Sequence, residues 1–272
     1  MSEISFTAQI LGKVGEWDPS NGMPEGYRPL VMLVPSRGRP QNVVHLMDAW
    51  RNTASGDARL VVAVDDDDPA IDDYKRVAQN AATAAWYDER RPEHQRLGMN
   101  FAEFVFGPRL RLGGTLNKLA GEIAPTCFAV GFLGDDHRPR SQGWDKRFMD
   151  ELFGLGTGLV YGNDLYQGAN LPTAVAMTSD VVTTLGYMVP PGLTHMYIDD
   201  AWKAIGQAIY RLSYLDDVII EHLHPLANKA PWDAGYEEVN AGSMYERDRA
   251  AFMRWQATSM ATDIERLRAV AE

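Results

Sequence analysis

Residues 30–40 read LVMLVPSRGRP, five apolar residues followed directly by polar and basic ones. A short continuous apolar run is typical of a strand that is buried on both faces of a parallel sheet. Proline suits the first position of a helix, so Pro40 predicts a helix that starts soon after this strand. The stretch therefore indicates a β-strand, a turn with one hydroxyl and two guanidinium groups, and a helix.

Two further apolar runs end in acidic residues. Residues 60–64 precede four aspartates at positions 65–68, and residues 127–133 precede Gly134-Asp135-Asp136-His137. Between the first two runs, apolar side chains recur at helical spacing (Val43, Leu46, Met47 and Trp50). Such strand–helix–strand alternation predicts a right-handed parallel sheet. Open α/β sheets bind ligands at the carboxyl ends of their strands, so three polar strand ends predict one cleft there.

The remaining segments indicate one α/β domain over residues 29–242. Recurrent glycine and proline predict an irregular lead-in over 1–28, and 243–272 predicts one amphipathic helix packed on the same domain. Asp68 is expected to cap a helix over 70–90 with Pro69 as its first residue. Residues 91–111 are ambiguous between helix and strand. The sequence also predicts helices from 113 and over 199–210, and strands over 158–162, 173–177 and 218–224.

Composition limits the function classes. A net charge of −11 disfavours tight non-specific binding to nucleic acid, which needs clustered Lys and Arg. No apolar stretch approaches the roughly 20 residues that cross a bilayer, and the first residues do not resemble a secretory signal. A single cysteine, Cys127, excludes an internal disulfide. We therefore expect a cytoplasmic protein.

Asp135-Asp136-His137 is the strongest candidate site. Adjacent carboxylates repel each other, and a divalent cation would relieve that repulsion. Carboxylate oxygens suit Mg²⁺ or Mn²⁺, and an imidazole nitrogen would favour Mn²⁺. The alternative is a solvated acidic turn, since Asp is common where strands end.

The neighbouring strand ends suit an anionic ligand. Ser36 and Arg37 can hold a diphosphate by charge-assisted hydrogen bonds, with Arg109 and Arg111 as further cations. Asp65 is placed to accept hydrogen bonds from a base or ribose. The alternative is an ordinary strand-to-helix turn with solvated charges.

Two later pairs of residues complete the candidates. His222 and His224 lie two apart, so on a strand both point to one face and could offer nitrogen to a metal. The alternative is a hydrogen-bonded pair at a sheet edge. Asp199 and Asp200 at a helix start either complement the helix dipole or supply a general base to an acceptor hydroxyl.

This order of motifs resembles the nucleotide-sugar-dependent glycosyltransferases of the GT-A fold, especially the inverting family-2-like enzymes and small bacteriophage-encoded relatives. The similarity covers about residues 30–225. It rests on the Pro35-Ser36-Arg37 turn, an acidic nucleoside contact (Asp65 or Asp67), and a Gly-x-x-x-Asn segment with Gly114 and Asn117. The acceptor-side pair Asp199-Asp200 and a late histidine, His222 or His224, also match.

The chain departs from the family at its Asp-x-Asp metal motif. If the frame is Gly134-x-Asp136, the ribose-facing carboxylate is missing. If it is Asp135-x-His137, Asp135 faces the ribose and histidine takes the metal-facing position. In either frame the resemblance implies a bound cation.

The resemblance implies a GT-A fold with a mostly parallel, Rossmann-like sheet, and a metal-dependent transfer from a UDP-sugar to an acceptor hydroxyl with inversion. Asp199 or Asp200 would be the base, and the acceptor could be a glycan, a protein or a modified DNA base. One alternative is a nucleotidyltransferase, although residues 36–40 are short for its glycine-rich loop. Another is a non-catalytic module that binds a nucleotide or glycan. The glycine and aromatic content of 226–245 predicts a mobile flap over the donor.

Overall fold

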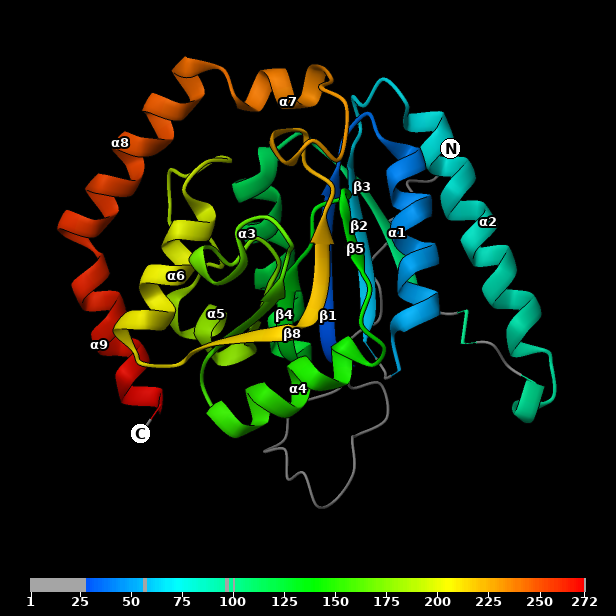
Figure 1. Ribbon diagram of the computed structural model, residues 1–272, viewed down its shortest axis with the longest axis horizontal. Coiled ribbons are helices and arrows are strands. Elements are labelled where there is room, and N and C mark those ends of the chain that lie inside the picture. The colour runs from blue at the N-terminus through cyan, green and yellow to red at the C-terminus, as the bar shows by residue number, and fades with distance from the viewer. Residues whose placement is uncertain (1–27, 56–57, 96–97, 100, 272) are drawn as a thin grey trace, which may run out of the picture.

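The structure is a computed structural model that describes residues 28–55, 58–95, 98–99 and 101–271 (Figure 1). The predicted lead-in over residues 1–28 lies outside the described residues except for Arg28, which begins the first strand. A central sheet of strands in the order β3-β2-β1-β4-β7-β6-β8-β5 runs through the molecule. Helices cover both of its faces, which confirms the predicted α/β class.

The first half of the sheet is parallel, as predicted. It contains β1 (Arg28–Ser36), β2 (Arg59–Asp65), β3 (Ala102–Gly107) and β4 (Cys127–Phe132). Their pairs β1–β2, β1–β4 and β2–β3 are all parallel, so the carboxyl ends of these strands meet at one edge.

The second half of the sheet contains both parallel and antiparallel pairs, which agrees with the predicted mostly parallel sheet. Here β7 (Val175–Thr178) pairs antiparallel with β4 and with β6 (Leu159–Asn163). The short strand β5 (His137–Pro139) pairs antiparallel with β8 (Leu212–His222), which is parallel to β6. The connection from β6 to β7 contains only one short 3₁₀ turn, and a parallel crossover usually needs a dozen or more residues with a helix.

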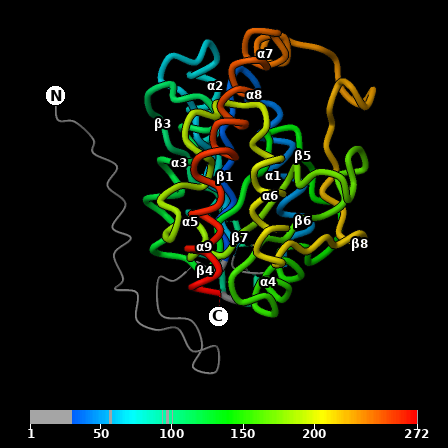
Figure 2. The backbone as a smooth tube through the Cα atoms, turned by 90° about the vertical axis from the view of Figure 1, so that its left-hand side faces the viewer, coloured from blue at the N-terminus to red at the C-terminus, as the bar shows by residue number. Residues whose placement is uncertain are grey.

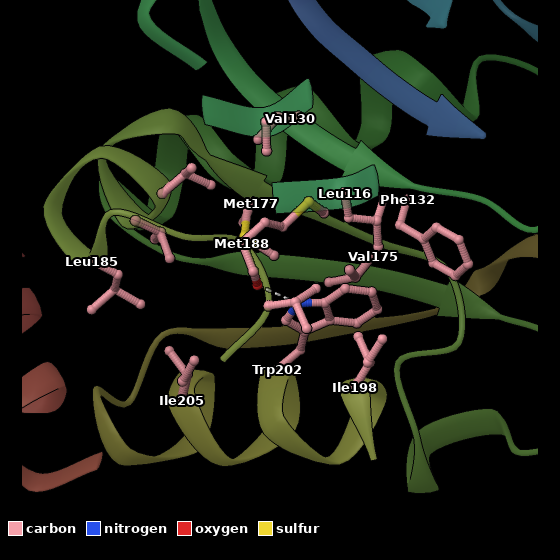
Figure 3. Close-up of a cluster of buried hydrophobic side chains, with 14 of the residues drawn as sticks. Leu116, Val130, Phe132, Val175, Met177, Leu185, Met188, Ile198, Trp202 and Ile205 are labelled. Carbon is pink, nitrogen blue, oxygen red and sulfur yellow. Dashed lines mark hydrogen bonds between the residues drawn. The ribbon is translucent and has the colours of Figure 1, made fainter. Parts of the chain in front are cut away.

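Two hydrophobic cores hold the helices on the sheet. One core contains side chains of α1 (Pro40–Thr53), α2 (Ile71–Glu89) and α4 (Trp144–Leu155). The other contains side chains of α3 (Arg111–Ile123), α5 (Ser179–Leu185) and α6 (Ile198–Ala208). Trp202 of α6 is fully buried in this second core, and its indole N–H donates to the Met188 carbonyl at 2.9 Å (Figure 3). This contact fixes the start of α6 against the sheet.

The C-terminal residues form two helices, α8 (Gly242–Thr258) and α9 (Met260–Ala271), where one was predicted. Figures 1 and 2 show them following one another along one side of the molecule, near α5 and α6. The break at Ser259 lets Asp263 accept a hydrogen bond from the Trp255 indole at 2.9 Å, and Leu267 of α9 is fully buried. None of the helices described is long and apolar enough to cross a membrane.

Asp68 caps no helix, which corrects a second expectation. The helix α2 begins at Ile71, and the Asp68 carboxylate accepts from the backbone N–H of Ala70 at 2.7 Å and of Gly38 at 2.8 Å. It therefore joins the turns that follow β1 and β2. Two other predicted boundaries differ from the structure. The helix α3 begins at Arg111 and not at 113, and β8 begins at Leu212 and not at 218.

The ambiguous residues 91–111 contain the edge strand β3. Its residues are only partly buried and Val105 is 39% exposed, so they lack the continuous apolar pattern that marked β1, β2 and β4. An edge strand has a neighbour on one side only, which relaxes the demand for buried side chains.

Candidate active site

A cavity of about 550 Å³ lies at the carboxyl ends of β1, β2 and β4, where the sequence predicted a cleft. The start of α6, the end of β8 and the short helix α7 (Ala234–Val239) complete its wall. The predicted site residues that line it are Pro35, Ser36, Arg37, Asp65, Arg109, Arg111, Asp135, Asp136, His137, Asp199, Asp200, His222 and His224. The structure thus brings together side chains from six separate parts of the chain.

Three predicted site residues do not line the cavity. The Asn117 amide accepts from the backbone N–H groups of Met188 and Val189 at 2.9 and 2.8 Å, so it holds the loop before α6. Gly114 lies within α3, and Asp67 is exposed and pairs with Arg37 at 2.5 Å. Asn117 therefore supports the site through the fold.

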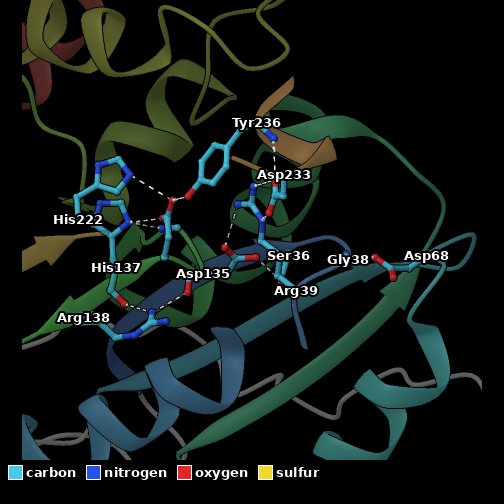
Figure 4. Close-up of polar contacts among 12 residues, drawn as sticks. Ser36, Gly38, Arg39, Asp68, Asp135, His137, Arg138, His222, Asp233 and Tyr236 are labelled. Atoms are coloured by element: carbon cyan, nitrogen blue, oxygen red, sulfur yellow. Dashed lines mark hydrogen bonds and ion pairs between the residues drawn. The ribbon is translucent and has the colours of Figure 1, made fainter. Parts of the chain in front are cut away.

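Asp135 is bound to the turn that follows β1. The Ser36 hydroxyl donates to Asp135 Oδ2 at 2.6 Å, and Arg39 Nη1 lies 3.5 Å from Oδ1 (Figure 4). The phenol of Tyr74, fully buried on α2, lies 2.6 Å from the Ser36 hydroxyl and accepts from the Arg39 N–H. Burial and the neighbouring Asp136 charge raise the pKa of Asp135 to about 6. Through these contacts Asp135 orders the turn that follows β1.

Asp136, and not Asp135, is the carboxylate that meets the histidines. Asp136 Oδ1 lies 3.3 Å from His137 Nδ1, and Oδ2 lies 3.3 Å from His222 Nε2. The two imidazole rings stack with centroids 4.2 Å apart (Figure 4). Burial alone would raise the pKa of Asp136, but the neighbouring His137 and His222 hold it well below its usual value.

The donor set of this cluster fits a divalent metal ion. Asp136, His137 and His222 each offer one ligand atom within 4.8 Å of the others, and the set is one carboxylate oxygen and two nitrogens. Two buried ring nitrogens, His137 Nε2 and His222 Nδ1, make no hydrogen bond within the part of the chain that the structure describes. His137 Nδ1, however, accepts from the Gly134 N–H at 2.9 Å and would have to give up that bond. Asp136 and His222 are therefore the stronger ligands.

Gly134 explains the chain's departure from the Asp-x-Asp motif. A Cβ at this position would lie 2.4 Å from an Asp136 carboxylate oxygen and 2.8 Å from His137 Nδ1. Since real Cβ atoms do not approach other atoms so closely, the position is closed to any side chain in this arrangement. A carboxylate at position 134 would therefore require Asp136 and His137 to move.

The arginines around the cavity are paired with carboxylates. Arg37 lies 3.0 Å from Asp65, and Arg109 and Arg111 lie 2.7 and 2.8 Å from Glu238. The other pair joins Arg39 to Asp233 by two hydrogen bonds of 2.7 and 2.6 Å. Asp233 lies just before α7, and Glu238 lies within it. The segment 233–238 therefore covers the cavity, and its carboxylates pair with the arginines.

Asp199 is the candidate base that the geometry favours. It begins α6 after Tyr197, which has the positive φ of 63° that turns the chain into the helix. Asp199 faces the cavity, and no hydrogen bond joins its carboxylate to another described side chain. Burial, with smaller contributions from other carboxylates, raises its pKa to about 7. A carboxylate with this pKa can accept a proton near neutral pH.

The other aspartate and the last histidine have less direct positions. Burial raises the pKa of Asp200, and the charge of Lys203 opposes the shift. His224 Nδ1 accepts from the Leu226 N–H at 3.2 Å, and the ring stacks on Tyr166 at the mouth of the cavity. His224 thus shapes the mouth, whereas His222 reaches Asp136.

Sequence reasoning missed four residues at the cavity. Tyr236 of α7 donates to Asp136 Oδ2 at 2.6 Å, and the Arg39 guanidinium lies 3.9 Å from the centre of its ring. Tyr166 and Tyr197 line the cavity, as does His195, whose pKa burial lowers to about 4. Only Tyr236 carried a signal, its place in the glycine- and aromatic-rich segment 226–245.

No protein-family model matches the chain, and no curated protein does. Solved structures do match. The mannosyltransferase PcManGT from Pyrobaculum calidifontis, in complex with GDP-Man and Mn²⁺, has a TM-score of 0.56 at 13% identity over 90% of this chain and 74% of that one. The chain has the GT-A fold. The expectation from the sequence is thereby confirmed at the level of the fold.

Two further structures agree. S. aureus TarS 1–349 in complex with UDP-GlcNAc has a TM-score of 0.53 at 10% identity, over 86% of this chain and 74% of that one. Glucosyl-3-phosphoglycerate synthase from Mycobacterium tuberculosis, in complex with Mn²⁺, UDP and glucosyl-3-phosphoglycerate, has a TM-score of 0.51 at 13% identity, over 84% and 79%. Nucleotides or nucleotide-sugars are bound in all three structures, and Mn²⁺ in two.

Proposed function

We propose that the protein is a metal-dependent glycosyltransferase that moves a sugar from a UDP-sugar to an acceptor hydroxyl with inversion. One observation carries the proposal. Asp136 with His222, the carboxylate of Asp199, which no other described side chain binds, and four arginines all face one cavity. These are the groups that a metal, a base and a diphosphate require.

Asp136 and His222 would hold the divalent ion, with His137 beside them. Oxygen and nitrogen ligands together suit Mn²⁺ better than Mg²⁺. When bound, the ion neutralises the charge that develops on the departing diphosphate. Mn²⁺ in two of the structural neighbours supports this choice.

The arginines would bind the diphosphate, and Asp65 the nucleoside. Arg37 and Arg109 both lie near Asp65, at 3.0 and 3.8 Å. Guanidinium groups make bidentate, charge-assisted hydrogen bonds to phosphate oxygens. To bind the diphosphate, Arg109 and Arg111 must release the Glu238 carboxylate. Donor binding therefore requires the 233–238 segment to move.

Asp199 would act as the general base. As the acceptor oxygen attacks the anomeric carbon, its proton passes to the Asp199 carboxylate. The bond from that carbon to the phosphate oxygen breaks, and its electron pair leaves with UDP. Attack from the face opposite the diphosphate inverts the anomeric configuration. A positioned base of this kind contributes about 10²–10⁴ in rate.

Calorimetry with UDP, in the presence and absence of Mn²⁺, tests the donor site directly. Asp136→Asn should abolish manganese-assisted UDP binding. Asp66→Asn, which changes an exposed aspartate in the turn after β2, should leave it unchanged. If Asp136→Asn binds UDP and Mn²⁺ like the original protein, the metal assignment fails.

Turnover assays separate the functions that the fold permits. Release of UDP from UDP-glucose, UDP-galactose or UDP-GlcNAc supports the transferase, and faster release of GDP from GDP-mannose would replace the UDP assignment. Pyrophosphate released from UTP and a sugar phosphate would identify a nucleotidyltransferase. Nucleotide binding without turnover of any donor would identify a binding module.

A further inference from the structure

The arginines that line the cavity all lie on one side of it. Each pairs with a carboxylate at the end of β2, in the turn after β4 or on the 233–238 segment: Arg37 with Asp65, Arg39 with Asp135 and Asp233, Arg109 with Asp65 and Glu238, and Arg111 with Glu238. This side therefore suits the anionic part of a ligand.

The opposite side is acidic. It is built from the start of α6, the loop between β6 and β7, and the end of β8. The charged groups that act on Asp199 there are Asp200, Asp164 and His222. Within the described ranges no arginine pairs with Asp199 or Asp200, and the Lys203 ammonium donates to the Asn170 carbonyl at 2.6 Å. This side therefore presents the Asp199 and Asp200 carboxylates to a ligand in the cavity.

Tyr166 adds a flat apolar surface to the acidic side. Its ring stacks on His224 with centroids 5.8 Å apart and planes 12° apart, and 38% of the residue stays exposed. Its backbone N–H donates to Asp164 Oδ1 at 2.9 Å, so the loop holds the ring in place. Nothing in the binding of a nucleotide to the arginine side uses this ring.

We propose that the acidic side of the cavity binds an uncharged carbohydrate as the acceptor, with a sugar ring packed on Tyr166 and one hydroxyl directed at Asp199. This deepens, and rests on, the proposed glycosyltransferase function. Carboxylates accept hydrogen bonds from sugar hydroxyls, whereas they repel a phosphate or carboxylate on the acceptor. An aromatic face provides apolar contact for the C–H face of a sugar ring.

The test uses the full chain with Mn²⁺, a labelled UDP-sugar and a glycan array. The array holds neutral oligosaccharides and, as matched pairs, the same oligosaccharides with a uronic acid or a sugar 6-phosphate. Label should enter neutral glycans, and the anionic partner of each should accept at least about tenfold less, as close like charges imply. Single-stranded oligonucleotides serve as a further anionic acceptor.

Variants of Tyr166 test the ring itself. Tyr166→Ala should raise the acceptor KM by about threefold to tenfold, the value of one lost aromatic contact, and leave the Kd for UDP unchanged. Tyr166→Phe keeps the ring and should retain the original KM.

Label on anionic glycans or oligonucleotides in preference to neutral ones overturns the proposal. So does an array without any labelled glycan while UDP is still released by hydrolysis, or a Tyr166→Ala variant with an unchanged acceptor KM. Failure of the proposed function has a different signature: neither manganese-assisted UDP binding nor UDP release occurs.

Discussion

The phenol of Tyr236 donates a 2.6 Å hydrogen bond to Oδ2 of Asp136, the same oxygen that faces His222. A residue 100 positions later in the chain thus donates a hydrogen bond to the carboxylate that is best placed to bind a metal. The Arg39 guanidinium over the Tyr236 ring and the Arg39–Asp233 pair hold this segment in position. Opening of the 233–238 segment and binding of a metal ion at Asp136 are therefore coupled.

Removal of the Tyr236 hydroxyl should strengthen metal binding. In Tyr236→Phe, Asp136 no longer gives up a hydrogen bond of about 1.5 kcal/mol when it binds Mn²⁺, so the affinity should rise about tenfold. Calorimetry with MnCl₂ measures the change. Tyr210→Phe, at a residue that is 85% exposed, is the matched control and should have no effect. Weaker Mn²⁺ binding in Tyr236→Phe would instead make the phenol a partner of the bound metal.

Release of two arginines should favour the nucleotide. Glu238→Gln removes the charge that pairs with Arg109 and Arg111, groups that are 30–40% exposed. Partly exposed ion pairs are worth about 0.2–1 kcal/mol, so the Kd for UDP should fall by no more than about fivefold. The effect should shrink at high salt because exposed charges are screened. Glu237→Gln, the adjacent exposed residue, provides the control, and an unchanged Kd in Glu238→Gln would separate these arginines from the diphosphate.

The rate of transfer should depend on the ionisation of Asp199. Its pKa is raised to about 7, and a base acts only when deprotonated. At saturating donor and acceptor, kcat should therefore be flat above pH 7 and fall about tenfold per unit below it. Asp199→Asn should lose about 10²–10⁴ in kcat while UDP binding is kept. If Asp200→Asn, and not Asp199→Asn, removes the inflection from the pH profile of kcat, Asp200 is the general base.

Asp248 of α8 should position the acceptor side from a distance. Its carboxylate is fully buried and accepts from the backbone N–H of Thr194, His195 and Met196 at 3.2, 2.7 and 2.8 Å. Asp248→Asn removes the charge that these N–H groups share and puts an amide NH₂ where Oδ1 now accepts from the Thr194 hydroxyl. The expected cost is about 2 kcal/mol, or roughly 5 °C in Tm.

The same variant has a functional readout. Because the loop over 194–197 leads into α6 and Asp199, Asp248→Asn should raise the acceptor KM and leave the Kd for UDP unchanged. Glu246→Gln, on an exposed side chain of the same helix, should change neither quantity. A lower Tm without a change in acceptor KM would limit Asp248 to a structural role.

Much of the donor side could be predicted because its signals are local. Continuous apolar runs marked the buried strands β1, β2 and β4, and the polar residues that follow each run had to meet at one edge of a parallel sheet. Pro40 marked the start of α1 for a steric reason that also lies within the chain. The edge strand β3 was not recognised as a strand from the sequence, because its side chains are only partly buried.

Other features had no local signal. Asp135 and Asp136 are adjacent and chemically identical, yet one binds Ser36 and Arg39 while the other meets His222. The same holds for Asp199 and Asp200, because the charge of His222 acts on Asp199 and that of Lys203 on Asp200. Contacts from α2, α7 and β8 made these distinctions, and each contact spans between 35 and 194 residues of chain.

The amino-acid sequence by itself determined the α/β class, the position of the cleft and part of its lining, because hydrophobic periodicity and strand direction act over a few residues. Only the tertiary structure decided which carboxylate faces the histidines, that Gly134 must lack a side chain, and that the 233–238 segment pairs with the arginines. The reason is physical: burial and charge pairing depend on neighbours in space, and those neighbours come from distant parts of the chain.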